Sequence, residues 1–297
     1  MALSSLDRVA IVPRLGKPNI RSICSELLEW LSGHQIESVM PMSEAEALGR
    51  QEIGCSDDEL VKDAHLIVVL GGDGTILKAA RLLNGKQTPI LGVNLGKLGF
   101  LAEVELGHLF AALEKTISGD FELEKRMLLD CEIRANGALI KKSSLNEIFV
   151  GRGASHKLVE FDIKINGKFF DRFSCDGLIF STPTGSTAYA LSAGGPLVSP
   201  ANKLILFVPV CPHSLFNRSL ILSEEDEIEI SLAQGASKCT VTIDGLVAWS
   251  NRCFDHIKVV GSSKAVNIVR FGKRDFYTIL REKLKIYSPF SDEESEA

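Results

Sequence analysis

Residues 65–83 read HLIVVLGGDGTILKAARLL, and this stretch decides the fold. The β-branched run from His65 to Leu70 predicts a buried strand. A glycine-rich turn follows over Gly71 to Thr75, and apolar residues at helical spacing then continue to Leu83. A strand, a glycine turn and a helix in this order are typical of a parallel α/β sheet, whose ligands bind beyond the carboxyl ends of the strands.

The same alternation extends over the first third of the chain. Apolar runs predict strands at residues 8–13 (RVAIVP), 35–40 (QIESVM) and 89–94 (PILGVN). Helical spacing predicts helices over residues 19–33 and 106–118. We therefore expect an α/β domain over residues 1–120.

The rhythm changes after about residue 119 to short strands joined by tight turns. Asn136-Gly137 and Asn166-Gly167 each separate two strand-like segments, which is the signature of a two-residue hairpin. The segment ALIKKSSLNEIFV at 138–150 is expected to form one strand after the first hairpin. We expect an all-β domain over residues 121–270 and a helical C-terminal segment over 271–297.

Composition excludes several classes of protein. The chain has 297 residues and a formal net charge of −5, so it does not bind nucleic acid through overall basicity. Its longest apolar runs are strand-sized, far below the ~18 residues of a membrane span, and it opens without a basic, apolar leader. Seven scattered cysteines without a CxxC pair argue against a disulfide framework or a zinc site. We expect a soluble, cytoplasmic protein with reduced thiols.

The turn Gly71-Gly72-Asp73-Gly74-Thr75 is the first segment with chemical content. Its three glycines allow backbone N–H groups to approach a phosphate closely. A carboxylate beside a phosphate would be repelled, so Asp73 indicates work on a hydroxyl or a metal, with its carboxylate facing the crevice and little else to do structurally. A tight turn capped by Asp73 and Thr75 is the alternative. Neither GxxxxGK[ST] nor GxGxxG occurs.

Two further segments are polar where strands end. Residues 94–100 read NLGKLGF, and Phe100 either stacks on a base in the crevice or is core under a loop. At 145–148 the pair Asn146-Glu147 interrupts an apolar strand. Its donors and acceptors suit ribose hydroxyls or an amide, while a solvated edge position is the alternative.

The longest such segment is DGLIFSTPTGSTAYALSAGGP at 176–196. It supplies hydroxyls, a proline-restrained turn, glycines and an aromatic ring. Because strand-like segments precede and follow it, we interpret it as a shaped binding loop rather than a flexible linker.

Together these segments resemble the NAD kinase family in its bacterial form. The resemblance rests on GGDGT at 71–75, LGF at 98–100, NE at 146–147 and the whole of 176–196, in the family's order over most of the chain. GGDGT alone also occurs in diacylglycerol and sphingosine kinases and in 6-phosphofructokinases, and the other three segments remove that ambiguity.

The resemblance implies an N-terminal α/β domain, a C-terminal β-sandwich-like domain, a tail that packs back on the first domain, and a homodimer or homotetramer. It implies transfer of the terminal phosphate of ATP, carried with Mg²⁺, to the adenosine 2′-hydroxyl of NAD. Asp73 would be the base, Gly74 would contact the dinucleotide, and Asn146 and Glu147 would bind its ribose. The remaining positions that match the family's binding loop are Asp176, Thr184, Thr187, Ala188, Tyr189, Ala190, Leu191 and Ser192. Lys157 lies near a position that is often basic.

One departure from the family is visible near the end of the β domain. Asp244-Gly245 is followed by Leu246, where many members carry a polar residue, often Gln, and an apolar side chain cannot supply that hydrogen bond. Two other functions stay open at this point. A lipid or sugar kinase would share GGDGT but not the later segments, and a non-catalytic dinucleotide sensor would need no base at Asp73.

Overall fold

The computed structural model describes residues 6–96, 99–153, 158–213, 218–233, 238–272 and 275–284. The chain divides into two compact units. Unit 1 comprises residues up to 82, residues 88–124 and the chain from 268 onward, and unit 2 comprises residues 83–87 and 125–267.

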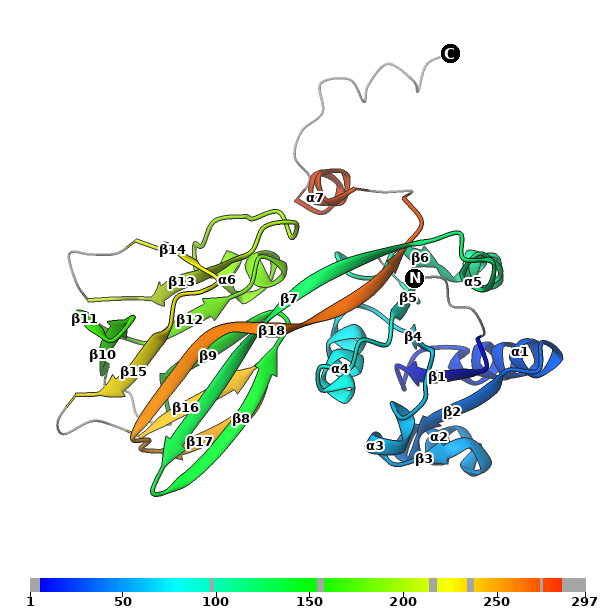
Figure 1. Ribbon diagram of the computed structural model, residues 1–297, viewed down its shortest axis with the longest axis horizontal. Coiled ribbons are helices and arrows are strands. Elements are labelled where there is room, and N and C mark those ends of the chain that lie inside the picture. Colours follow the sequence, from blue (N-terminus) through cyan, green and yellow to red (C-terminus); the bar gives the residue numbers. More distant parts are fainter. Residues whose placement is uncertain are drawn as a thin grey trace, which may run out of the picture. The chain divides into compact units, whose positions relative to one another are not determined.

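Unit 1 is built on a parallel sheet with strand order β3-β2-β1-β4-β5 (Figure 1). The short strand β6 and the end of β18 each pair with β5, also in parallel. Its strands are β1 (Arg8–Pro13), β2 (Glu37–Pro41), β3 (Gly54–Cys55), β4 (Leu66–Leu70), β5 (Ile90–Asn94) and β6 (Val104–Glu105). Its helices are α1 (Ile20–Gly33), α2 (Met42–Leu48), α3 (Asp57–Leu60), α4 (Asp73–Leu83, whose last residue falls in unit 2), α5 (Leu109–Ser118) and α7 (Phe276–Leu284), with 3₁₀ turns η1 (Gln51–Ile53) and η2 (Leu106–His108).

The sequence explains why these elements form. β4 and β5 are buried along their whole length, as continuous apolar strands of a covered parallel sheet should be. Helix α1 turns Ile23, Leu27 and Leu31 into the core, at the spacing that one buried helical face requires. The predicted α/β domain is confirmed, although α2 and α3 were not anticipated because both are short.

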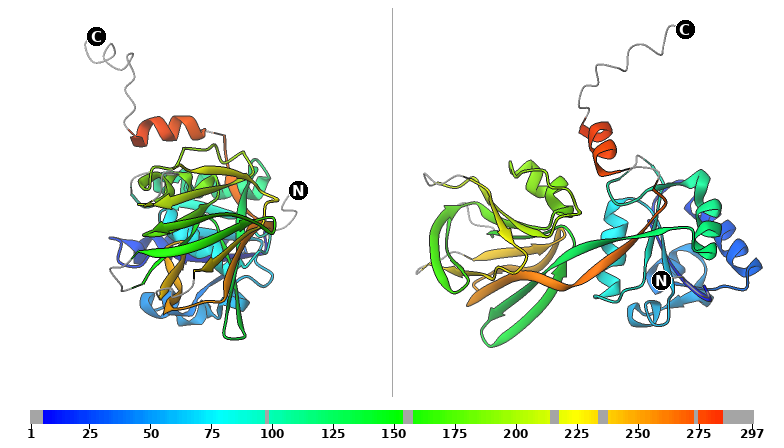
Figure 2. Two further views of the ribbon diagram at one scale, coloured as in Figure 1. Left: turned by 90° about the vertical axis from the view of Figure 1, so that its left-hand side faces the viewer. Right: turned by 45° about the horizontal axis from the view of Figure 1, so that its top comes forward.

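Unit 2 contains two antiparallel sheets. One has the order β11-β10-β15-β18, with β7 beside β18 and β8 beside β7; the long strands β7 and β18 run side by side (Figure 2). The other has the order β14-β13-β12-β9-β16-β17. The strands are β7 (Glu122–Ala135), β8 (Ala138–Ser144), β9 (Glu147–Arg152), β10 (Val159–Ile165), β11 (Lys168–Cys175), β12 (Gly177–Ser181), β13 (Leu204–Val210), β14 (Leu220–Ser223), β15 (Ile228–Leu232), β16 (Cys239–Ile243), β17 (Leu246–Arg252) and β18 (His256–Arg270).

Both predicted hairpins are confirmed. Asn136 and Gly137 have φ of 50° and 79°, and Asn166 and Gly167 have φ of 52° and 75°. Two successive residues at positive φ form the turn that matches the twist of the strands it joins, and Asn-Gly is the dipeptide that adopts it most easily.

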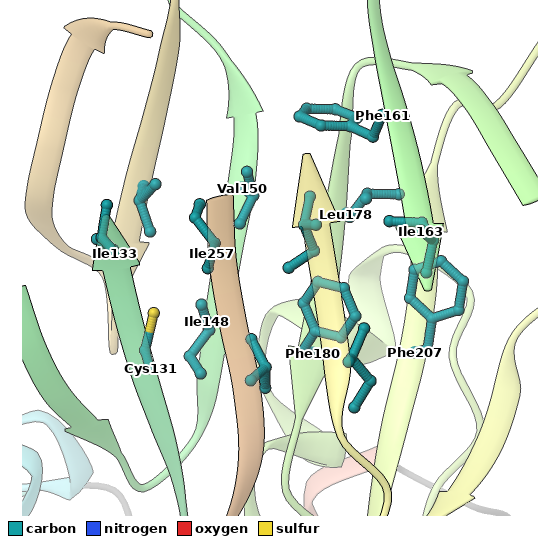
Figure 3. Packing of buried hydrophobic residues seen from close by; sticks show 14 of the residues in the cluster. Cys131, Ile133, Ile148, Val150, Phe161, Ile163, Leu178, Phe180, Phe207 and Ile257 are labelled. Carbon is teal, nitrogen blue, oxygen red and sulfur yellow. The ribbon is translucent and has the colours of Figure 1, made fainter. Parts of the chain in front are cut away.

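In the sheet that contains β12 and β13, successive side chains point to opposite faces, and both faces are covered. Phe180 and Phe207 point into the core between the two sheets, where their rings stack with centroids 5.1 Å apart (Figure 3). Their neighbours Ile179 and Leu206 point the other way and pack against Ala190 of α6 (Tyr189–Ser192). The β12–β13 loop is therefore anchored on the outer face of this sheet.

The prediction of one strand over residues 138–150 is wrong. β8 ends at Ser144 and β9 begins at Glu147, and the two strands belong to different sheets. The chain changes sheet at Leu145 and Asn146, whose N–H groups bond to a side chain rather than to a neighbouring strand.

Two expectations from composition can be compared with the structure. No helix in the described ranges has the length and apolar character that a membrane crossing requires. All seven cysteines lie in the described ranges and are free thiols, and four of them are buried.

Candidate functional site

In unit 1, the turn between β4 and α4 places Asp73 at the first residue of the helix. The N–H of Gly71 donates to the carbonyl of Val93 on β5 at 2.9 Å, which fixes the start of the turn. A Cβ on Gly71 would overlap the side chain of the buried Thr75, so this position requires glycine. The prediction that the glycine cluster follows the strand and opens the helix is confirmed.

The Asp73 carboxylate has a structural role that the sequence did not suggest. Its Oδ2 accepts from the N–H of Phe100 at 2.8 Å, and its Oδ1 accepts from the N–H groups of Leu101 and Ala102 at 3.1 and 3.4 Å. The expectation that Asp73 has little to do structurally is therefore wrong. The described bonds of this carboxylate go to a loop 27 to 29 residues away rather than to the first turn of α4.

Gly99 is the residue that allows this contact. A Cβ at Gly99 would lie inside the contact distance of all three carboxylate atoms of Asp73. Its φ is not in the left-handed region, so the requirement for glycine here is space alone.

Phe100 lies against the C-terminal helix. Its half-buried ring lies 6.2 Å from the ring of Phe276 on α7, tilted by 42°. The ammonium of Lys283, also on α7, lies 5.2 Å from the ring centroid, which is a cation–π distance. The C-terminal helix thus contacts the loop that Asp73 holds, and part of the Phe100 ring is covered by it.

A depression with a volume of about 420 Å³ lies beside the same helix terminus. Its walls carry two cations, Arg14 and Lys78, and one buried carboxylate, Glu44, which pairs with Lys78. The start of α4 adds N–H groups and the positive end of the helix dipole, an arrangement that favours anions. The complete lining is Pro13, Arg14, Leu15, Glu44, Gly74, Thr75 and Lys78.

In unit 2, Glu147 is the first residue of β9, which pairs with β12 on one side and β16 on the other, and Asn146 directly precedes it. The alternative of a solvated edge position is therefore wrong. Glu147 is only 7% exposed, and its Oε2 has no hydrogen-bond partner among the described residues. A buried acceptor without a donor is costly and marks a place where a ligand donor would be favourable.

Burial, together with a smaller effect of the Asp244 charge, raises the pKa of Glu147 to about 7. A hydrogen bond from the backbone N–H of Tyr189 opposes this shift. Burial also raises the pKa of the Tyr189 hydroxyl, and the charges of Cys211, Asp176 and Glu147 add to that shift. Glu147, Asp176 and Tyr189 therefore share one electrostatic environment, as their membership of one predicted site requires.

Asp244 organises the backbone around this pair. Its carboxylate accepts from the hydroxyl of Ser144 at 2.6 Å and from the N–H groups of Leu145, Asn146 and Glu147 at 3.0, 2.7 and 3.3 Å. These bonds end β8 and direct the chain into β9.

The segment after β12 folds into helical turns, and its first residue is hydrogen-bonded to Asn146. It forms η3 (Thr184–Thr187) followed by α6. The carbonyl of Asn146 accepts from the N–H of Thr182 at 2.9 Å and from the hydroxyl of Ser181 at 3.2 Å. A Cβ on Gly185 would overlap that same carbonyl, so the loop can approach only because this position is glycine. The interpretation as a shaped loop is confirmed.

The remaining predicted residues differ in what they offer a ligand. Thr184 is buried and accepts from the guanidinium of Arg126 at 3.3 Å. Asp176 lies 3.3 Å from Arg152, and Tyr189 is 43% exposed with its ring edge-on to Phe149. Ala190 is core, so its methyl group is not available to a ligand, whereas Thr187, Ala188, Leu191 and Ser192 are partly or fully exposed. Lys157 lies outside the described residues.

Two residues of this environment were not among the predicted site residues. Arg126 is buried on β7 directly after Glu124 and Lys125, so the local sequence gives no sign that it is buried. Asp244 stands in a hairpin turn, where Asp-Gly is expected for its backbone conformation alone. Neither role can therefore be read from the local sequence.

Models of one protein family match both halves of the chain. The family model described as the ATP-NAD kinase N-terminal domain matches residues 9–121, and that of the ATP-NAD kinase C-terminal domain matches residues 145–271. The chain belongs to the ATP-NAD kinase family. Membership makes it a phosphotransferase that acts on NAD, as the sequence predicts.

Individual relatives agree over nearly the whole length. An NAD kinase of Moorella thermoacetica is 37% identical over 98% of this chain and 94% of its own, and one of Geobacter metallireducens is 38% identical over 94% and 99%. Among solved structures, a yeast NADH kinase in complex with NADH has a TM-score of 0.88 at 30% identity, covering 96% of this chain and 89% of its own. An NAD kinase from Archaeoglobus fulgidus in complex with ATP has a TM-score of 0.73 at 26% identity, covering 95% and 100%.

Leu246, the departure from the family pattern, begins β17 directly after the Asp244-Gly245 turn and is 51% exposed. Its side chain makes the turn region more apolar on the surface without contributing a hydrogen bond, and nothing in the structure explains why leucine stands there.

We expect Gly99→Ala to dislodge the Asp73 carboxylate from the loop, because the new methyl group and the carboxylate cannot occupy the same space. Leaving buried N–H groups without acceptors should lower the free energy of unfolding by about 1–3 kcal/mol. Denaturant titration measures this. Gly107→Ala, where a Cβ meets nothing within 4 Å, is the control and should change stability by less than about 0.5 kcal/mol. Equal effects of the two variants would contradict the contact.

We expect the Glu147→Gln variant to gain stability relative to the wild-type protein as the pH rises from about 4.5 to about 7. The folded-state pKa of Glu147 lies above its unfolded value, so ionisation over this interval weakens the wild-type fold, whereas Gln does not ionise. The difference in unfolding free energy should change by about 3 kcal/mol, since each pKa unit corresponds to about 1.4 kcal/mol. Parallel stability curves of the two proteins would contradict the raised pKa.

Proposed function

We propose that the protein transfers the terminal phosphate of ATP to the 2′-hydroxyl of the adenosine ribose of NAD and so produces NADP. The observation that carries the proposal is the half-exposed carboxylate of Asp73 at the start of α4, flanked by glycines. Family membership supports NAD as the acceptor, and the complexes of related kinases with NADH and with ATP support both ligands.

Asp73 is proposed to accept the proton of the 2′-hydroxyl as its oxygen attacks the phosphorus. A carboxylate has about four acceptor positions, and the described bonds use three of them: two on Oδ1 and one on Oδ2. We infer that Oδ2 faces the hydroxyl. The three N–H bonds would hold the base in one orientation during transfer, which lowers the entropic cost of the reaction.

The triphosphate of ATP is assigned to the depression beside α4. Arg14, Lys78 and the helix terminus would neutralise its charge, and charge neutralisation together with positioning is the main task of a protein in phosphoryl transfer. The described residues contain no group of three or more Asp, Glu, His or Cys side chains that could hold a metal. Mg²⁺ would therefore come with ATP, and it would supply positive charge to the transferred phosphate.

NAD is assigned to the predicted residues of unit 2. The orphaned Oε2 of Glu147 would accept from a ribose hydroxyl, and Asn146 would offer a donor and an acceptor beside it. Tyr189 would contribute an exposed aromatic face, Thr187 and Ser192 would contribute hydroxyls, and Asp176 and Thr184 would support the loop. Gly74 and Lys157 would contact the dinucleotide, and Phe100 would contribute the part of its ring that α7 does not cover.

Three further properties remain proposals. We propose that the protein is a homodimer or homotetramer and that it is located in the cytoplasm. We propose ATP as the phosphoryl donor, and the same assay with polyphosphate in place of ATP tests the alternative donor. Incubating the protein with NAD, ATP and Mg²⁺ and measuring NADP tests the function. A protein that binds NAD but forms no NADP would instead be a sensor.

We expect Asp73→Asn to lower kcat by ~100-fold or more, because the amide cannot accept the proton. The amide also offers one acceptor atom in place of two, so the variant should lose about 1–3 kcal/mol of stability as well. Gly99→Ala is the matched variant, since it disturbs the same bonds and keeps the base.

If Asp73 is the base, the loss of kcat in Asp73→Asn exceeds that in Gly99→Ala by at least ~10-fold. Equal losses would mean that Asp73 only holds the loop. An NAD analogue that lacks the adenosine 2′-hydroxyl should bind without reacting, and phosphate on any other hydroxyl would overturn the assignment.

We expect Tyr189→Ala to raise KM for NAD by about 10-fold with little change in melting temperature, because a 43% exposed ring contributes more to stacking on a ligand than to the core. Phe169→Ala is the control, as Phe169 is 62% exposed on β11 and outside the predicted site. A lowered melting temperature with unchanged KM would identify Tyr189 as a structural residue.

A further inference from the structure

The turn that carries Asp244 does not by itself explain the carboxylate. Asp244 and Gly245 have φ of 48° and 75°, and they join Ile243 of β16 to Leu246 of β17 in a two-residue hairpin. Two further such hairpins in the described part of unit 2 have asparagine at this position, at Asn136 and Asn166. Asparagine satisfies the turn, so the side chain at 244 is acidic for another reason.

The reason lies in the donors that surround it. Four hydrogen bonds from residues 144–147 converge on the two oxygens of Asp244, which is 9% exposed. Oδ1 accepts three of them and Oδ2 accepts the one from Leu145. An asparagine would place an NH₂ group against at least one of these donors, whereas a carboxylate can accept all four.

The same residues carry the two polar side chains of the predicted NAD site. The N–H groups of Asn146 and Glu147 are both held by Asp244, and the N–H of Asp244 donates to the carbonyl of Glu147 at 3.0 Å. The carbonyl of Asn146 in turn holds the loop at Ser181 and Thr182. A shift of residues 144–147 would therefore move Asn146, Glu147 and the loop together.

We propose that Asp244 is a positioning residue for the reaction: its carboxylate fixes the backbone of residues 144–147 and thereby the placement of Asn146 and Glu147 against NAD. It reaches no reacting atom and acts through the residues that it holds. The proposal rests on NAD being the substrate, and its tests include a measurement that needs no substrate.

The charge of Asp244 provides that measurement. Asp244 is the charged group that raises the pKa of Glu147, while a hydrogen bond from the backbone N–H of Tyr189 lowers it, and burial raises the pKa of the Tyr189 hydroxyl. Replacing Asp244 by a neutral residue removes a negative charge, so the pKa of Glu147 should fall. Replacing a carboxylate that does not lie beside residues 144–147 would leave this titration unchanged, so the titration reports whether Asp244 lies against Glu147.

The experiment compares Asp244→Asn with Asp226→Asn in the full-length protein. Asp226 is the matched control because its carboxylate accepts from the N–H of Ser223 at 2.8 Å and from the amide of Asn166 at 2.7 Å, away from the predicted site. The side-chain carboxyl carbon resonance of Glu147 is followed against pH without ligand, and kcat/KM for NAD is measured with ATP and Mg²⁺.

We expect the Glu147 midpoint to lie near pH 7 in wild type and in Asp226→Asn, and at lower pH in Asp244→Asn. In Asp244→Asn, kcat/KM should fall by about 100-fold, the order of effect of a ~1 Å misplacement. An unmoved midpoint, or kcat/KM equal to that of Asp226→Asn, overturns the proposal.

Ser144→Ala keeps the test decisive if Asp244→Asn does not fold. It removes the 2.6 Å donor and leaves the carboxylate, so kcat/KM should fall by about 10-fold while the Glu147 midpoint stays near that of wild type. Wild-type kinetics in Ser144→Ala would count against positioning by Asp244. Absence of turnover in the wild-type protein would count against the proposed function alone, since the titration does not depend on it.

Discussion

A carboxylate that accepts several backbone N–H groups holds an irregular segment in place in each unit. Asp73 takes the N–H groups of residues 100–102, and Asp244 takes those of residues 145–147. Backbone that leaves a helix or sheet still needs partners for its N–H groups, and water cannot serve where the backbone is buried. Charge-assisted bonds to one carboxylate meet this need and are stronger than bonds between neutral groups. The close approach of the Asp73 carboxylate explains glycine at 99, and the close approach of the Asn146 carbonyl explains glycine at 185.

Much of the fold was predictable because its signals are local. The strand at Arg8–Pro13 was predicted to the residue, and both Asn-Gly turns adopt the positive φ values that their composition implies. The change of sheet after Ser144 was not predictable. Residues 138–150 contain no Gly or Pro to mark the end of a strand, and the break is imposed by Asp244, which lies almost one hundred residues further along the chain. A bond between such distant residues leaves no trace in local periodicity.

The site shows the same division. Composition identified GGDGT, the Asn-Glu pair and the long loop, because each combines glycine or polar residues with a strand end. What each side chain does was less accessible. Asp73 was expected to have little structural role and instead binds a loop, and the contacts of Phe100 with Phe276 and Lys283 of the C-terminal helix were not anticipated. These partners follow from tertiary contacts that no motif spells out.

The two carboxylates differ in how accessible they are, and this difference separates their proposed roles. Asp244 is 9% exposed and its two oxygens receive four bonds, so a ligand has little access to it. Asp73 is half-exposed and receives three described bonds, of which Oδ2 accepts one. The buried carboxylate is suited to holding residues that bind, and the half-exposed one is suited to receiving a proton. The same interaction can therefore support positioning in one unit and chemistry in the other.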